Sequence, residues 1–188
     1  GPDVWHAHCV KLDAEEIALF SRTQTGVAHC PCSNCRLASG IAPVRAMRDA
    51  RVPVGLGVDG SASNDAGNLM AEARQTLLLQ RLAYGAGAMS PGEALEIATL
   101  GGARVLGRDD CGALAPGKCA DVVIWDMDDV SAAGNWDPAA ILLAGPTLAR
   151  DVFVNGQQVV SEGRITTLDQ RALARKQNQQ MSELQERV

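Results

Sequence analysis

Short apolar runs alternate with amphipathic stretches over the N-terminal third of the chain. The runs at 3–9, 27–30 and 53–58 are brief and are bounded by polar residues, glycine or proline, which is typical of buried strands. The stretches at 13–23 and 42–50 have the character of helices, and the first opens with a capping box. The order strand, helix, strand, helix, strand predicts repeated parallel βαβ units.

Two more helices are expected after the third strand, and the pattern changes beyond residue 108. A helix is expected over 68–84, and Ser90 opens another, with proline at its first position and a capping box. Further on, β-rich runs at 120–126 and 151–160 predict a small sheet, with Asn155-Gly156 as a type I′ turn. The end of the chain is polar and helix-prone. We therefore expect three segments: 1–108, 109–168 and 169–188.

Each predicted strand ends near a residue that can bind a metal or catalyse a reaction: His8, His29 or Asp59. Because the carboxyl ends of parallel strands lie on one side of a sheet, we expect these side chains to face one pocket. Imidazole and carboxylate groups are the donors that a catalytic Zn²⁺ or Fe²⁺ binds. In the alternative interpretation, each side chain only forms hydrogen bonds with a loop, and the spacing leaves both open.

Four weaker patterns have simpler explanations. His6 would share the strand face of His8, but a packing role suits it equally well. The cysteines at 30, 32 and 35 resemble a zinc knuckle without a second ligand pair nearby. The glycines at 55–60 match a dinucleotide motif by letters, yet no helix is expected to begin at Gly60. The solvated face of the helix over 68–84 is expected to include Glu72, Arg74, Gln75 and Arg81.

Composition narrows the classes of function. The chain has 17 Lys and Arg against 22 Asp and Glu, a net charge of −5, and no basic run, so no nucleic-acid partner is expected. Its six cysteines have irregular spacing and predict reduced thiols. No apolar stretch is long enough to span a bilayer and no signal peptide is visible. We therefore expect a cytoplasmic protein with no membrane partner.

Five ordered motifs resemble those of the amidohydrolase superfamily. They are AHC at 7–9, HCPCSN at 29–34, GIAP at 40–43, GVDGSASN at 57–64 and GALAPGKCAD at 112–121. The chain is most similar to the branch that holds cytosine, guanine and S-adenosylhomocysteine deaminases and the triazine hydrolases. Within that branch, residues 58–65 and 72–75 look most like those of 8-oxoguanine deaminases.

The resemblance implies a role for each of four residues. Asp59 matches the aspartate that ends the last barrel strand, binds the metal and shuttles a proton from the attacking water. His8 matches the histidine after the sixth strand, which orients or stabilises that water and the developing charge. His29 and Asn34 match the seventh-strand loop, which borders the substrate. One divalent metal ion, Zn²⁺ or Fe²⁺, is implied as the cofactor.

The resemblance implies an α/β fold that is the C-terminal part of a metal-dependent (β/α)8 TIM barrel. Residues 1–108 correspond to strands six to eight, 109–168 to part of a composite β-sandwich and 169–188 to a C-terminal helix. A full barrel takes about 250 residues. The chain lacks the family's His-x-His pair and its fifth-strand histidine and glutamate. Because it also starts at Gly1 rather than Met, we expect part of a longer protein that is inactive alone.

The activity expected of the full-length protein is metal-dependent hydrolytic deamination of a purine-like heterocycle, of the 8-oxoguanine or guanine type. Two alternatives stay open. The first is an s-triazine chloro- or aminohydrolase, and the second is a non-catalytic dinucleotide-binding or structural module. A small heterocyclic substrate is the expected partner, and a homo-oligomer is expected for the full-length protein.

Overall fold

The computed structural model describes residues 1–128, 130, 132–134, 136–145 and 148–187. These residues form two compact units. One consists of Gly1–Lys118 with Ser131–Pro146, and the other of Cys119–Val130 with Thr147–Val188. Val188, the last residue of the predicted C-terminal segment, lies outside the described residues.

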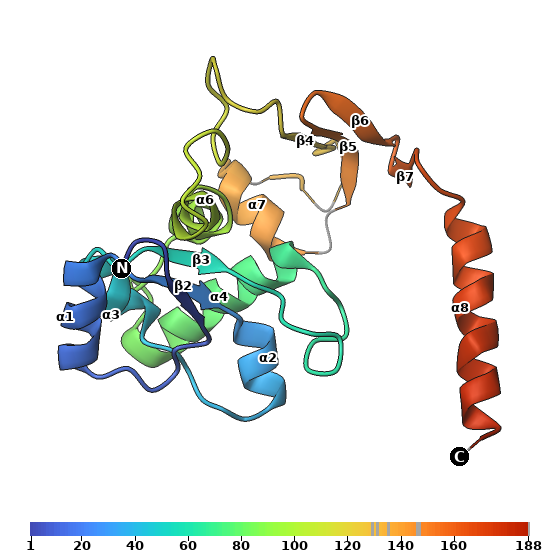
Figure 1. The fold of residues 1–188 in the computed structure, drawn as a ribbon. Coiled ribbons are helices and arrows are strands. Elements are labelled where there is room, and N and C mark those ends of the chain that lie inside the picture. Colours follow the sequence, from blue (N-terminus) through green and yellow to red (C-terminus); the bar gives the residue numbers. More distant parts are fainter. Residues whose placement is uncertain (129, 131, 135, 146–147, 188) are drawn as a thin grey trace. The chain divides into compact units, whose positions relative to one another are not determined.

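The first unit is built on a parallel sheet with the strand order β1 (Trp5–Ala7), β2 (Gly26–His29), β3 (Val54–Leu56) (Figure 1). Ala7 pairs with Ala28, and His29 pairs with Leu56, so the three strands end at nearly the same level. The predicted strands and their parallel pairing are confirmed, with shorter bounds than expected. This register brings the residues that follow each strand to one edge of the sheet.

The prediction that the first strand is buried is wrong. All three residues of β1 are exposed, including Trp5 at 50%. The reason is its position: β1 is an edge strand that pairs only with β2 within the described sheet. Its apolar side chains therefore have a neighbouring strand on one side only.

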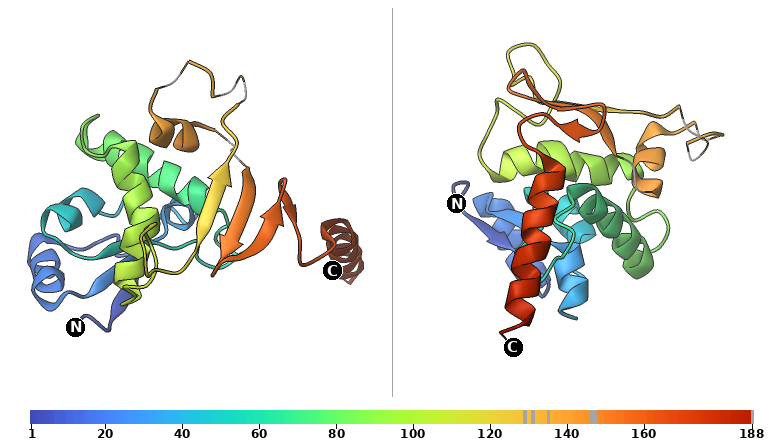
Figure 2. Two further views of the ribbon diagram at one scale, coloured as in Figure 1. Left: turned by 90° about the horizontal axis from the view of Figure 1, so that it is seen from above. Right: turned by 90° about the vertical axis from the view of Figure 1, so that its right-hand side faces the viewer.

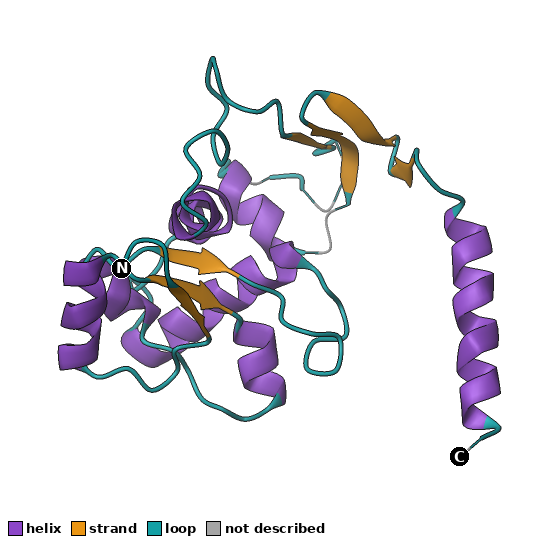
Figure 3. Ribbon diagram, viewed as in Figure 1, coloured by secondary structure: helices purple, strands orange, loops and turns teal. Residues whose placement is uncertain are grey.

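Helices of the first unit lie around the three strands (Figure 3). Both predicted capping boxes are present, in α1 with Asp13 and Glu16 and in α5 with Ser90 and Glu93. α5 runs on through a π-helical turn, η1, into α6. The helices of this unit are α1 (Ala14–Thr23), α2 (Pro31–Arg36), α3 (Val44–Asp49), α4 (Leu69–Tyr84), α5 (Pro91–Glu96), η1 (Ile97–Gly101), α6 (Gly102–Val105) and α7 (Pro138–Ala144).

Two of these helices, α2 and α7, are not predicted by the sequence pattern. Each begins with a proline, Pro31 or Pro138, at a first-turn position. Proline ends a strand, but it also suits the first helical position, where its missing N–H would have no intrahelical partner. In this structure Pro31 is the first residue of α2, which begins two residues after the last residue of β2.

The core of the first unit is aliphatic, in keeping with a chain in which only 3% of the residues are Phe, Trp or Tyr. Val27 and Val54 from the sheet form one cluster with Met47, Leu77 and Ile97 from the helices. Val27, Met47 and Ile97 are fully buried. The two further views show the helices of this unit on more than one side of the sheet (Figure 2). The cluster holds the strands rigidly, so the edge that carries the polar residues is well defined.

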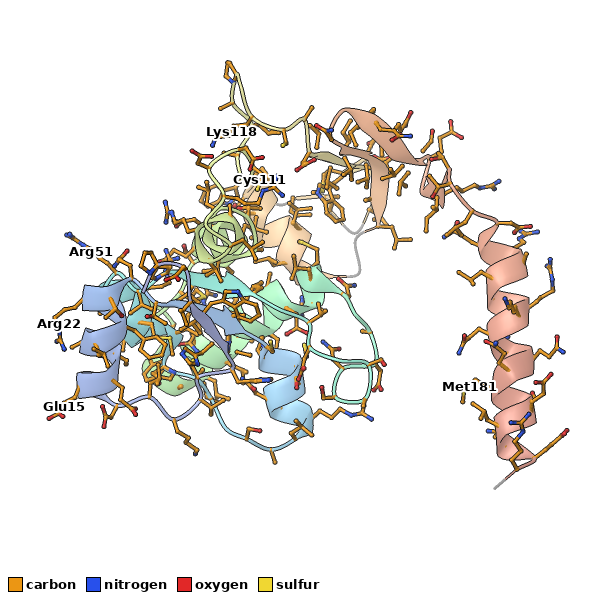
Figure 4. All side chains as sticks on the ribbon, viewed as in Figure 1. Glu15, Arg22, Arg51, Cys111, Lys118 and Met181 are labelled. Carbon is orange, nitrogen blue, oxygen red and sulfur yellow. The ribbon has the colours of Figure 1, made fainter. Side chains whose placement is uncertain are left out.

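The second unit is an antiparallel sheet followed by a helix. Both β-rich runs predicted from the sequence are confirmed, and Asn155 and Gly156 have the positive φ angles, 49° and 78°, that a type I′ turn requires. The C-terminal helix is also confirmed; none of its residues is buried, and Met181 is one of its exposed side chains (Figure 4). The elements are β4 (Val122–Trp125), β5 (Ala149–Val154), β6 (Gln157–Ser161), β7 (Arg164–Ile165) and α8 (Gln170–Gln185).

Among the described residues, no helix has the length and apolar character needed to cross a bilayer.

Candidate functional site

His8 and Asp59 meet at the carboxyl edge of the parallel sheet. His8 directly follows β1, and Asp59 lies in the loop after β3. The His8 Nε2 and Asp59 Oδ2 atoms are 3.6 Å apart, and the two side chains are 36% and 31% exposed, so both are open to a small ligand. Both residues have a left-handed backbone, with φ of 66° and 62°. Such a conformation persists in a residue other than glycine only where the surroundings impose it.

The Asp59 carboxylate is held by three hydrogen bonds. Ser33 Oγ donates to Asp59 Oδ2 at 2.6 Å, Ser63 Oγ donates to the same oxygen at 2.8 Å, and the Gly60 N–H donates to Oδ1 at 2.8 Å. These bonds, that from Ser33 foremost, lower the pKa of Asp59 to about 2 because they favour the charged form. Asp59 is therefore ionised at neutral pH.

Asn34 orients the His8 ring. His8 Nδ1 and Asn34 Oδ1 are 2.9 Å apart. An amide oxygen can only accept, so this contact places a proton on His8 Nδ1, and in the neutral ring Nε2 is then the accepting nitrogen on the side of Asp59. Asn34 is 2% exposed, so its position is fixed by the interior. The structure thus brings Asn34, His8 and Asp59 together; the substrate contact expected for Asn34 stays a prediction.

His29 is the last residue of β2, the central strand, and is almost fully buried. It is 1% exposed, and neither ring nitrogen has a hydrogen-bond partner among the described residues. Burial, with a smaller electrostatic contribution from the neighbouring His8 imidazole, lowers the pKa of His29 to about 3. The ring is therefore neutral at physiological pH. Its predicted role beside the substrate stays a prediction.

We expect His29 to make the protein less stable as the pH falls below 6.5. The unfolded residue takes up a proton near its ordinary pKa of 6.5, whereas the folded one resists protonation down to about 3. Between these values the unfolded state binds more protons, so the free energy of unfolding falls by up to about 1.4 kcal/mol per pH unit. Urea unfolding of wild type and His29→Gln measures this: the variant, which cannot titrate, should lose stability less steeply. Equal slopes would contradict the prediction.

Several residues that support the site are not singled out by the sequence pattern. Ser33 precedes Asn34 and Ser63 comes four residues after Asp59, both within the recognised motifs, and this proximity in sequence is the only signal for them. The expected solvated position of Glu72 is wrong, because it is 1% exposed. The start of α4 lies against α2, and the Glu72 carboxylate accepts hydrogen bonds from the Cys32 N–H and from Asn64 Nδ2.

His6 does not share the site of His8. Its ring lies 5.4 Å from that of Phe20 in α1, measured between centroids. The strand ends at Ala7, and the left-handed backbone of His8 breaks the alternation that would have placed both rings on one face. His6 is therefore a packing residue at an exposed edge.

The glycine pattern at 55–60 lacks the structure that a dinucleotide site needs. No helix begins at Gly60, because the next helix along the chain, α4, starts at Leu69. Gly55 instead allows close packing: a Cβ there would lie 2.8 Å from the Gly102 Cα. The pattern therefore reflects the contact between β3 and α6, and it gives no support to nucleotide binding.

The donor atoms at this edge fit a divalent metal only in part. The Asp59 carboxylate and Nε2 of a neutral His8 ring are suitable donors. Among the described residues, however, no group of three His, Cys, Asp or Glu side chains is arranged to hold a metal ion, and this covers the cysteines at 30, 32 and 35. Catalytic zinc sites use three protein ligands. The described part of this chain therefore does not supply a complete site.

The chain is similar in sequence to known deaminases. Over 174 residues, the chain is 50% identical to the 8-oxoguanine deaminase of Pseudomonas aeruginosa. The aligned region covers 92% of this chain and 39% of that protein. Over 186 residues, it is 46% identical to an isoxanthopterin deaminase from an unknown prokaryotic organism, covering 90% of this chain and 39% of that protein. The chain therefore spans about two fifths of the length of these relatives.

Solved structures and family membership give the same result. The zinc complex of the atrazine chlorohydrolase from Arthrobacter aurescens TC1 matches with a TM-score of 0.87 and 37% identity, covering 94% of this chain and 40% of that one. Residues 1–159 match the amidohydrolase family. On this evidence, the chain belongs to the amidohydrolase family.

Proposed function

We propose that the full-length protein containing this chain is a metal-dependent hydrolase that releases an exocyclic amine of a purine-like heterocycle as ammonia. The observation that carries this proposal is the convergence of His8 and Asp59 at the edge of a parallel sheet, in a chain that is 50% identical to an 8-oxoguanine deaminase. In the proposal, β1, β2 and β3 correspond to strands six to eight of a (β/α)8 barrel. Active sites of such barrels lie at the carboxyl ends of the strands.

Each residue of the site has a separate task in this proposal. Asp59 is ionised, would be the ligand that this chain gives to the metal, and accepts a proton from the attacking water. His8, with its Nδ1 proton held by Asn34, accepts a hydrogen bond at Nε2 and so orients that water. A bound divalent metal, Zn²⁺ or Fe²⁺, would supply the Lewis acidity that makes water nucleophilic near neutral pH. His29 and Asn34 are proposed to border the substrate.

The bond changes in the proposed reaction balance without a redox partner. The water oxygen forms a bond with the ring carbon that bears the amine, and the bond between that carbon and the exocyclic nitrogen breaks. One proton of the water is accepted by Asp59 and returned to the leaving nitrogen, which departs as ammonia. The other proton ends on the neighbouring ring nitrogen. The product carries an oxo group in place of the amine.

The test is release of ammonia by the full-length protein loaded with zinc. The panel comprises 8-oxoguanine, guanine, isoxanthopterin and a chloro-s-triazine. Turnover of a fused-ring substrate is the expected result, and lack of turnover of every fused-ring compound would contradict the proposal. The 188-residue chain alone, supplied with zinc, should give no turnover, since its described residues contain no group of three side chains that could hold the metal ion. Measurable turnover by the chain alone would show that this explanation is wrong.

A second candidate is hydrolysis of an s-triazine. The similarity to the atrazine chlorohydrolase favours it, because that structure matches 94% of this chain. Release of chloride or amine from the triazine, with no turnover of the fused rings, would select this candidate.

A further inference from the structure

Glu72 is a buried carboxylate that joins two segments behind the site. It lies in the first turn of α4 and is 1% exposed. Its Oε2 atom accepts a hydrogen bond from the Cys32 N–H at 3.0 Å, and its Oε1 atom accepts one from Asn64 Nδ2 at 2.6 Å. A buried carboxylate is costly unless its oxygens are paired in this way. The positions of the Cys32 N–H and of the Asn64 side chain therefore depend on these hydrogen bonds to Glu72.

The first donor belongs to α2, which carries two residues of the site. Cys30, the N-cap of α2, makes no side-chain hydrogen bond to the helix. Glu72 compensates by accepting the free Cys32 N–H of the first turn, where a negative charge is favourable. The next two residues along α2 are Ser33, which binds Asp59, and Asn34, which binds His8. The placement of α2 therefore sets both contacts.

The second donor belongs to the loop that carries Asp59. Asn64 Nδ2 donates to Glu72 and also to the Val58 carbonyl oxygen at 2.6 Å, directly before Asp59. Ser63, the residue before Asn64, donates to the Asp59 carboxylate. Asn64 thus ties both ends of this loop to α4 through Glu72. The left-handed backbone of Asp59 lies inside the segment that is held in this way.

We propose that Glu72 is a positioning residue: it fixes α2 and the loop over 58–64 relative to each other, and so sets the geometry of His8 and Asp59 without touching the substrate. The catalytic part of this inference rests on the proposed function. Its structural part concerns only the described residues of this chain. The two parts can therefore be tested separately.

Glu72→Gln tests the proposal with almost no change in volume. One carboxylate oxygen becomes an NH₂ group, which must face either the Cys32 N–H or the Asn64 amide. Asn64 cannot turn over without losing its bond to Val58. A donor then faces a donor on one side, and the link between α2 and the loop is broken.

Gln80→Glu is the matched control. Gln80 is on the same helix and is also fully buried, but its oxygen accepts from the Arg45 N–H and its nitrogen donates to the Ala42 carbonyl oxygen. Arg45 lies in α3 and Ala42 two residues before its start, and the side chain of Arg45 bonds to Ala88, Glu93 and Asp49 rather than to a residue of the site. The change likewise breaks one buried hydrogen bond, because a carboxylate oxygen then faces the Ala42 carbonyl oxygen, and it also buries a charge. It should lower the melting temperature as Glu72→Gln does and leave the site unchanged.

Two readouts separate positioning from a loss of stability. In the 188-residue chain, the ¹⁵N NMR signals of the His8 ring should show one tautomer with the proton on Nδ1 in wild type and Gln80→Glu, and a tautomer mixture in Glu72→Gln. In the zinc-loaded full-length protein, Glu72→Gln should lower kcat about tenfold or more with little change in KM, as is usual for residues that orient metal ligands. Gln80→Glu should stay within about twofold of wild type.

Wild-type His8 signals together with wild-type kcat in Glu72→Gln would overturn the proposal, and so would equal losses in both variants. If Glu72→Gln does not fold, Glu72→Asp takes its place: it keeps the charge, shortens the reach and should lower kcat in the same direction. An unchanged kcat in folded Glu72→Asp would also overturn the proposal. If the full-length wild type shows no deamination but the His8 signals still change in Glu72→Gln, the proposed function fails and the positioning role stands.

Discussion

Replacement of Asp59 by asparagine is expected to reduce kcat/KM of the full-length protein by about a thousandfold, since general-base catalysis alone contributes 10²–10⁴. The amide keeps the size of the side chain but removes its charge. It can neither accept a proton from water nor offer the metal an anionic oxygen. Ser33 and Ser63, which both donate to the carboxylate, would also lose one charged acceptor. The measurements are steady-state ammonia release and the zinc content of the purified protein.

Asp65→Asn is the matched control for this change. Asp65 lies in the same loop, is exposed, and forms an ion pair with Arg36 rather than with a residue of the site. Exposed ion pairs contribute little to stability, about 0–1 kcal/mol. We therefore expect the control to keep near wild-type activity and zinc content. If Asp59→Asn is as active as Asp65→Asn, Asp59 has no part in the chemistry.

A single methyl group at Gly101 is expected to destabilise the protein by about 3 kcal/mol or more, at the upper end of the range for overpacked sites. A Cβ at Gly101 would overlap the carbonyl oxygen of Val54, and the Val54 carbonyl carbon would be only 3.3 Å away. Both atoms belong to the backbone of β3, which the core holds in place. Neither can move aside as the end of a flexible side chain would. The measurement is the free energy of unfolding of Gly101→Ala in urea.

Gly102→Ala is the control, because it is the adjacent residue and nothing lies within 4 Å of a Cβ built there. Gly102 has helical backbone angles, so alanine should be neutral or stabilising by roughly 0.5–1 kcal/mol. If the two variants unfold at the same urea concentration, the close contact between η1 and β3 does not restrict the residue at position 101, and the prediction is wrong. Because β3 leads to the loop of Asp59, Gly101→Ala should also lower activity in the full-length protein.

The parts of the fold that depend on neighbouring residues are predictable from the sequence. The capping boxes of α1 and α5 and the Asn155-Gly156 turn each involve residues within a few positions, and all three are present. The helix α2 is different. Pro31 is compatible with the end of a strand and with the start of a helix, and contacts outside the segment decide between them.

In the candidate site, too, some features follow from the local sequence and others depend on contacts between distant segments. The convergence of His8 and Asp59 is predictable because parallel strands have their carboxyl ends on one side of the sheet. The burial of Glu72 is not, because its partner Cys32 is 40 residues away in the chain. A glutamate in a helix that also carries Arg74 and Arg81 has the composition of a solvated face. The contacts of Glu72 with α2 and with Asn64 place it in the interior.

A crystal structure of the zinc-loaded full-length protein, with the metal located by anomalous scattering, tests the central claim most directly. We predict a single zinc ion with an Asp59 carboxylate oxygen about 2.0–2.2 Å away, the usual zinc–oxygen distance, and His8 Nε2 within hydrogen-bond reach of a water at that ion. Zinc bound elsewhere, with Asp59 directed away from it, would contradict the claim that this edge of the sheet is the active site.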